Sequence, residues 1–166
     1  MTSASLALGR SLCVVPYTDA EARQQLLDAL AAATEEIGVA LADLGEAYEQ
    51  LDVAAADRLE EELFRPLQAS YGLAQRVHGE FAARYGLPAP AFARAQVQVR
   101  EHDAKAIMNR AAAGVERADA ALGALQDSML PVEVGDPPLR AGLAAVRTGL
   151  GEIRGRTREI TRTLGR

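Results

Sequence analysis

The side chains that could carry acid–base, metal or nucleophilic chemistry are few in this sequence. Its only histidines are His78 and His102, and neither belongs to a Glu-x-x-His pattern, which would bring a carboxylate and an imidazole together inside a bundle. Three consecutive glutamates at 60–62 are more typical of a solvated helix face than of a metal site. The single cysteine, Cys13, has no nearby histidine to activate it. We therefore predict a protein that is not an enzyme and uses no metal and no cofactor.

The composition indicates that long helices would position any site. Hydrophobic residues make up 49% of the 166 residues but aromatic residues only 4%, so small aliphatic side chains would fill the core. Alanine and leucine are strong helix formers, and the uncharged stretches are too short to span a bilayer. One cysteine permits no internal disulfide, which fits a reducing compartment. These features predict a soluble, all-α, cytoplasmic protein.

The first 18 residues differ in composition from the rest. They contain no acidic residue, one arginine (Arg10) and several Ser, Ala and Leu residues. We interpret residues 1–18 as a flexible tail, with an organellar targeting segment or a membrane-seeking amphipathic helix as alternatives. Residues 19–166 are predicted to form a single helical domain.

The first helix is predicted to begin at a capping box made by Thr18 and Glu21. Apolar residues then recur at intervals of three and four, which is the pattern of a coiled-coil seam. We predict that this seam fills the core and also forms the contact of a homodimer, because it is longer than one compact bundle needs. Its members include Leu30, Ile37, Leu41, Leu44, Tyr48 and Leu51.

Three more helices are predicted from shifts in the apolar register and from the prolines. The second has Asp57 as N-cap, and Pro66 inside it is predicted to bend the helix rather than end it. The third covers 91–128, and the fourth follows a loop at 131–138 with Asp136 as cap. Short loops favour antiparallel neighbours, so the expected fold is an elongated antiparallel bundle of about four long helices with coiled-coil packing.

Charge is distributed unevenly along the chain. Residues 19–62 carry 13 acidic residues and two arginines, for a net charge of −11, whereas residues 139–166 carry seven arginines and two glutamates, for +5. The basic end either binds an anionic partner, lipid or nucleic acid, or packs against the acidic first helix. The total charge of −5 and the lack of a recognition motif argue against nucleic acid.

One stretch, 38–72, resembles BAR domains. It contains the sequences RLE at 58–60, PL at 66–67 and YG at 71–72, and AR follows at 83–84. The stretch is most similar to the Chibby-interacting BAR proteins of the ciliary base and more distantly similar to sorting-nexin BAR domains. The resemblance implies a BAR-like bundle, a dimeric crescent on anionic membranes, and a role as a scaffold in membrane remodelling or ciliogenesis. It also implies that Pro66 is the kink of the second helix.

In such a dimer the loop between the second and third helices lies at the tip of each arm. No acidic residue occurs in the segment 81–100, which mixes arginines with apolar side chains. We predict membrane contact through Arg84, Arg94, Arg100, Tyr85, Leu87 and Phe92. The alternative is an ordinary loop whose aromatic rings fold back onto the bundle.

Two other functions are compatible with the sequence. One is a purely structural helical subunit of a larger cytoskeletal or ciliary assembly, without lipid contact. The other is a metal- or cofactor-binding bundle, which the missing His–carboxylate spacing disfavours.

Overall fold

The computed structural model describes residues 18–97 and 101–164, and within these ranges the chain is helical and contains no strand. In chain order the elements are α1 (Asp19–Tyr48), α2 (Val53–Leu59), the π-helical turn η1 (Glu60–Phe64), α3 (Arg65–Tyr85), α4 (Ala104–Asp127), α5 (Leu130–Val134) and α6 (Pro137–Leu164). The all-α prediction is confirmed. Of the tail predicted at 1–18, residues 1–17 lie outside the described residues.

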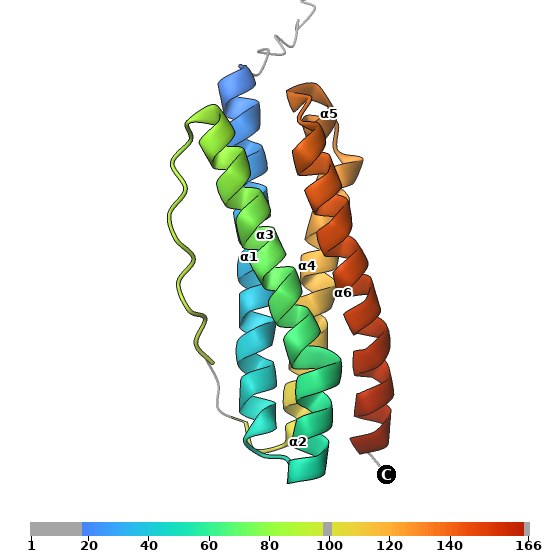
Figure 1. Ribbon diagram of the computed structural model, residues 1–166. Coiled ribbons are helices and arrows are strands. Elements are labelled where there is room, and N and C mark those ends of the chain that lie inside the picture. The colour runs from blue at the N-terminus through green and yellow to red at the C-terminus, as the bar shows by residue number, and fades with distance from the viewer. Residues whose placement is uncertain (1–17, 98–100, 165–166) are drawn as a thin grey trace, which may run out of the picture.

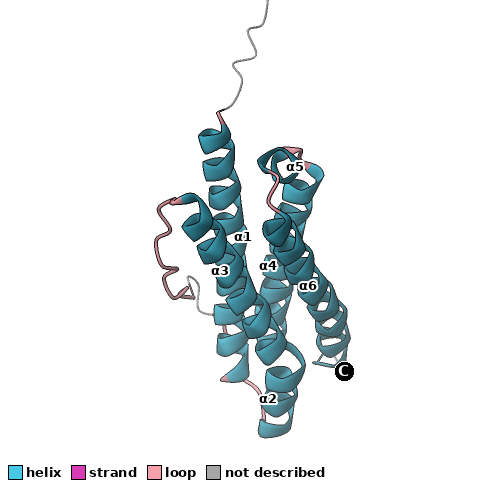
Figure 2. Ribbon diagram, turned by 45° about the horizontal axis from the view of Figure 1, so that its top comes forward, coloured by secondary structure: helices cyan, strands magenta, loops and turns pink. Residues whose placement is uncertain are grey.

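Four long helices form the bundle, with each one packed against two neighbours (Figure 1). Helix α1 packs against α3 and α4, and α6 packs against the same two helices, so α1 and α6 occupy diagonal corners. The direction of the chain makes every packed pair antiparallel (Figures 1 and 2). Helices α3 and α4 are consecutive in sequence, yet they are parallel and lie on the other diagonal.

The connection from α3 to α4 differs from the prediction. A third helix was expected from residue 91, but α4 begins at Ala104, where the Asp103 side chain caps it by accepting the Lys105 amide at 3.0 Å. Residues 86–103, here called the linker, run back along the bundle as an extended crossover in their described part (Figure 1). Pro88 and Pro90 remove two backbone donors, and parallel helices need a long connection, which together account for the extended chain.

The second predicted helix also begins earlier than expected. Asp52, not Asp57, is its N-cap, since the Asp52 carboxylate accepts the Ala55 amide at 3.0 Å. The helical backbone then continues through η1 and past Pro66, which lies in the first turn of α3. In η1 the Arg65 amide bonds to the Glu60 carbonyl, five residues back. Prolines and π-turns are both sites of helix bending, so the bend at Pro66 remains a prediction.

The ends of α1 and α6 follow their predicted caps. The Thr18 hydroxyl accepts the Glu21 amide at 3.3 Å, and the Glu21 carboxylate accepts the Thr18 amide at 2.9 Å, which confirms the capping box. The Asp136 carboxylate accepts the Leu139 amide at 2.7 Å and so caps α6. The loop expected at 131–138 instead contains the short helix α5.

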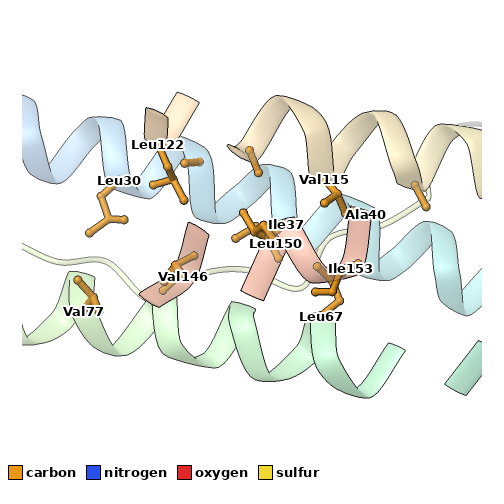
Figure 3. Packing of buried hydrophobic residues seen from close by; sticks show 14 of the residues in the cluster. Leu30, Ile37, Ala40, Leu67, Val77, Val115, Leu122, Val146, Leu150 and Ile153 are labelled. Atoms are coloured by element: carbon orange, nitrogen blue, oxygen red, sulfur yellow. The ribbon is translucent and has the colours of Figure 1, made fainter. Parts of the chain in front are cut away.

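The core is a continuous set of side chains from all four long helices, mostly Leu, Ile, Val and Ala together with Phe81 and Met108 (Figure 3). Of the predicted seam, Leu30, Ile37 and Leu44 are fully buried in it. Helix α6 approaches α3 closely because Gly142 and Gly149 face Val77 and Ser70; a Cβ on either glycine would lie 2.5 Å from the facing side chain. The glycines of α6 thus serve packing at these two positions.

Candidate functional site

The residues predicted to form a membrane-contacting tip do not come together in one cluster. The Arg84 guanidinium makes two hydrogen bonds, of 2.9 and 2.8 Å, to the carboxylate of Asp136. Tyr85 packs against Phe81, with ring centroids 5.0 Å apart, and under the guanidinium of Arg23 at 4.4 Å. These contacts tie the end of α3 to the starts of α1 and α6, so Arg84 and Tyr85 have a structural role at this end of the bundle.

The remaining tip residues are spread along the linker. Leu87 packs against the core. Phe92 lies beside α3, with its ring 5.0 Å from that of His78 and 6.5 Å from that of Tyr71. Arg94 is exposed further along the linker, and Arg100 lies outside the described residues. The alternative in which aromatic rings fold back onto the bundle matches these positions.

Asp136 is the centre of the network that joins α3 to α6. Burial raises the pKa of its carboxyl, but the hydrogen bonds from Arg84, from the Leu139 amide and from Tyr85 outweigh burial and hold the pKa below its usual range. The same bond to Asp136 raises the pKa of Arg84. Asp136 is therefore charged at neutral pH.

The apolar seam of α1 packs mainly within the chain's own bundle. Its buried members contact the core, and Leu41 and Leu51 are half-buried against it. Tyr48, with 41% of its surface exposed, is the most accessible of the six. A second copy of the chain therefore cannot use Leu30, Ile37 or Leu44 unless the bundle opens.

Ion pairs link α4 to both of its neighbours. Toward α1, Arg110 pairs with Asp43 and Glu46, at 2.8 and 2.6 Å, and Arg117 pairs with Glu36. Toward α6, the acids of α4 pair with three arginines: Asp119 with Arg147 and Arg154, and Glu116 with Arg158. The expectation that the basic end packs against the acidic first helix is wrong, because α4 separates the two.

Charge is consequently segregated across the diagonal of the bundle. Helix α1 carries seven acidic residues and one arginine, for a net charge of −6, and α6 carries six arginines and two glutamates, for +4. Along α6 the spacing of 7, 7, 4 and 4 residues places five arginines on one stripe next to α4. This arginine stripe consists of Arg140, Arg147, Arg154, Arg158 and Arg162.

A groove lies where the linker covers the packed pair of α1 and α3. Its cavity volume is about 700 Å³. The linker is fixed on both sides of the groove: Phe92 contacts α3, and near α4 the Glu101 amide donates to Glu46 at 3.1 Å while Gln50 donates to the Glu101 carbonyl at 2.6 Å. Small and apolar residues line part of the groove: Gly38, Leu41, Ala42, Gly45, Phe64, Tyr71, Ala95 and Val97. Nearly as many polar or charged residues line the rest: Glu46, Glu49, Gln50, Gln68, Arg94, Glu101 and His102.

The two histidines lie in different environments. His78 is buried beside Phe92, and desolvation lowers its pKa although Asp28 acts in the opposite direction. His102 is exposed at the rim of the groove. Among the described residues there is no group of three or more His, Cys, Asp or Glu side chains that could hold a metal ion. No helix in the described ranges is long and apolar enough to cross a membrane.

Comparisons with protein-family models, with curated proteins and with solved structures gave no match for this chain. The charge distribution and the groove are therefore the features of the molecule that bear on its function. Sequence reasoning missed the groove because its walls come from α1, η1, α3 and the linker. The available signal was the pair Gly38 and Gly45, seven residues apart on one face of α1.

Proposed function

We propose that this chain is a non-enzymatic helical scaffold that binds an anionic membrane through the arginine stripe of α6. The observation that supports this proposal is the segregation of charge, with −6 on α1 and +4 on α6 at diagonal corners. A membrane that faces α6 therefore does not face α1, so the acidic half does not repel the lipid. Binding in this orientation replaces the tip contact, since Arg84 is engaged by Asp136.

The stripe is suited to a flat, negatively charged surface. From Arg140 to Arg162 it extends over 22 helical steps of α6, or about 33 Å. Its arginines are at least partly exposed, and Arg158 is 69% exposed. Glu116 and Asp119 are the only acidic residues in ion pairs with it among the described residues, so positive charge remains in excess. Each basic side chain near an anionic leaflet contributes about 1 kcal/mol.

The BAR-like part of the proposal concerns assembly. Because part of the sequence resembles BAR domains, we propose that the scaffold acts as a homodimer in membrane remodelling or ciliogenesis. Because Leu30, Ile37 and Leu44 are buried, the dimer contact has to use other residues. Tyr48 and the half-buried Leu41 and Leu51 are the seam members within reach. Sedimentation velocity at several protein concentrations tests for the dimer, and a protein that stays monomeric at high concentration excludes it.

Vesicle co-sedimentation tests the membrane surface. The wild-type protein is expected to bind vesicles containing phosphatidylserine, not neutral phosphatidylcholine vesicles, and to be released by salt. The triple variant R140E/R158E/R162E should lose binding. A matched variant, R65E/R76E/R94E, has the same net charge but changes only exposed arginines of α3 and the linker. If the matched variant loses binding and the α6 variant does not, the membrane contacts the α3 and linker side; if wild type never binds, the proposal is wrong.

A second candidate is a structural subunit of a larger assembly. The observation that favours it is the same diagonal charge: the acidic α1 face of one copy complements the α6 stripe of the next, a head-to-tail contact that extends into polymers. Light scattering without vesicles distinguishes it. Self-association that salt abolishes and R140E/R158E/R162E prevents would support the assembly, whereas a monodisperse protein at low salt would exclude it.

A further inference from the structure

The groove beneath the linker has the size of a small-molecule site. Its volume of about 700 Å³ falls within the usual range for ligand pockets, roughly 300–1,000 Å³. Leu41, Phe64 and Val97 give it an apolar lining. At Gly45 a Cβ atom would meet no other residue within 4 Å, so the floor of the groove is open at this position. Covering this apolar surface with a ligand removes it from water, which contributes favourable free energy to binding.

The end of the groove next to the C-terminus of α1 is electrostatically negative. Glu46 and Glu49 lie there, and the last turn of α1 contains no basic residue. A helix C-terminus carries a partial negative charge, so acidic side chains are disfavoured at this place unless a cation compensates them. Arg110 compensates Asp43 and Glu46. The carboxylate of Glu49 adds to the negative potential at this end.

Glu101 on the linker strengthens the same potential. Its carboxylate accepts the amides of His102 and Asp103, at 2.9 and 3.4 Å, and is thereby held in place at the rim. The exposed Arg94 also lines the groove, from the part of the linker that is close in sequence to the Phe92 anchor. The groove therefore combines apolar residues with carboxylates at the end next to the C-terminus of α1, and Arg94 is the one Lys or Arg residue among its described lining residues.

We propose that the groove binds an organic cation, an ammonium group carried on an apolar body. The ammonium lies beside Glu49 and Glu101, and the apolar body lies over Leu41, Phe64 and Tyr71. Aromatic faces at Phe64 and Tyr71 add cation–π and ring contacts that a hydrated inorganic cation would not use. This activity is separate from membrane binding, because the groove lies between α1, α3 and the linker, whereas the arginine stripe lies on α6 next to α4.

Three probes that share one apolar body and differ in the charge of the head group test whether the groove prefers a cation. Isothermal titration compares 4-phenylbutylammonium, the neutral 4-phenylbutanol and the anionic 4-phenylbutanoate on the full chain. The ammonium should bind most tightly and the carboxylate at least about tenfold more weakly, since one charge is reversed at the negative end. Equal or tighter binding of the carboxylate overturns the proposal, and so does the absence of binding by the ammonium.

Two leucine substitutions locate the site without disturbing the fold. Gly45→Leu fills the groove and should abolish ammonium binding. Gly151→Leu is the matched control, because Gly151 also has open space around its Cα but lies on α6. Both changes replace a helical glycine by a better helix former, so circular dichroism should show an intact bundle. Ammonium binding that survives Gly45→Leu, or that Gly151→Leu abolishes, places the ligand elsewhere and overturns the proposal.

A charge variant distinguishes the contribution of the ammonium group to binding from that of the apolar body. Glu49→Gln should weaken the ammonium about fivefold and leave 4-phenylbutanol unchanged. Glu80→Gln is the control, as Glu80 is an exposed carboxylate on α3 that does not line the groove. An equal loss for the ammonium and the alcohol, or an equal effect of both variants, contradicts the assignment of Glu49.

Discussion

Helix α1 packs against its two neighbours in different ways. Toward α4 the contact is close: a Cβ on Gly114 would lie 3.1 Å from the Cβ of Ala40. Toward α3 the ring of Tyr71 lies against Gly38, where a Cβ would be 3.3 Å from the ring, and beyond it the groove opens. Small residues on both helices allow close approach, whereas one large ring fills a single gap and leaves volume next to it.

Charged side chains are also distributed differently on the α4 side and the α3 side of α1. On the α4 side Arg110 and Arg117 connect the two helices, and Asp43 is almost fully buried in the contact. On the α3 side the linker takes the place of such pairs, with hydrogen bonds from Glu101 and Gln50 at one anchor and the Phe92 ring at the other. A surface closed by complementary side chains provides stability, and a surface covered by a linker keeps room for a ligand.

The largest expected effect comes from truncating the buried seam. Ile37→Ala removes a side chain that is 0% exposed and should cost about 2–4 kcal/mol of unfolding free energy. Leu41→Ala, on the half-buried groove side of α1, should cost less than about 1.5 kcal/mol. Urea denaturation measures both. If Leu41→Ala costs as much as Ile37→Ala, the groove side is packed as tightly as the core and the contrast fails.

Enlarging a glycine should have opposite signs on the two sides of α1. Gly114→Leu places atoms against Ala40 and should cost about 1–3 kcal/mol, through overpacking of the α1–α4 contact. Gly45→Leu meets open space and should be neutral or stabilise by up to about 1 kcal/mol, because leucine favours the helix. Melting temperatures of the two variants check the signs, and a destabilised Gly45→Leu protein would show that the groove is smaller than described.

Much of this arrangement follows from local sequence, and the rest depends on distant contacts. The caps at Thr18 and Asp136 are local patterns, so they were predicted correctly, and so was the burial of the seam members Leu30, Ile37 and Leu44. The start of α4 was missed because apolar spacing continues upstream of Asp103, and periodicity alone cannot distinguish a helix from an extended segment that packs on a bundle. The N-cap at Asp52 was missed for a related reason: Asp57, five residues later, is an equally good capping residue.

The candidate sites show the same limit. The arginines of α6 and the acids of α1 were identified from composition, but their diagonal placement depends on α4 lying between them. The groove depends on where the linker runs, and this is decided by contacts such as that of Phe92 with His78, 14 residues apart in sequence but on different elements. Side-chain contacts across elements of this kind leave no periodic signal.

Removing the Phe92 anchor should have an intermediate effect. Phe92→Ala deletes the ring contacts with His78 and Tyr71 and should cost about 1–2 kcal/mol, less than a core truncation because the ring is only half-buried. Amide hydrogen exchange should then increase in the linker and stay unchanged at the α1–α4 contact. Faster exchange on both sides of α1 would mean that the linker supports the whole bundle.

The smallest expected effect is a pH dependence located at His78. Burial lowers the pKa of this imidazole in the folded chain, so the unfolded chain binds the proton more readily. The stabilisation is therefore fully present above the unfolded pKa of about 6.5 and is lost as the pH falls below it toward the folded pKa. On α1, Asp28 favours the charged imidazole, which keeps the effect small. Asp28 and Glu35 both border the same small cavity, and residues 88–92 of the linker carry no charge there. Urea midpoints at pH 8.0 and 5.5 should differ less in His78→Gln than in the wild type, and His102→Gln, at an exposed site, should behave as the wild type does. A wild-type protein that becomes more stable on acidification across this interval would show that Asp28 outweighs the burial of His78.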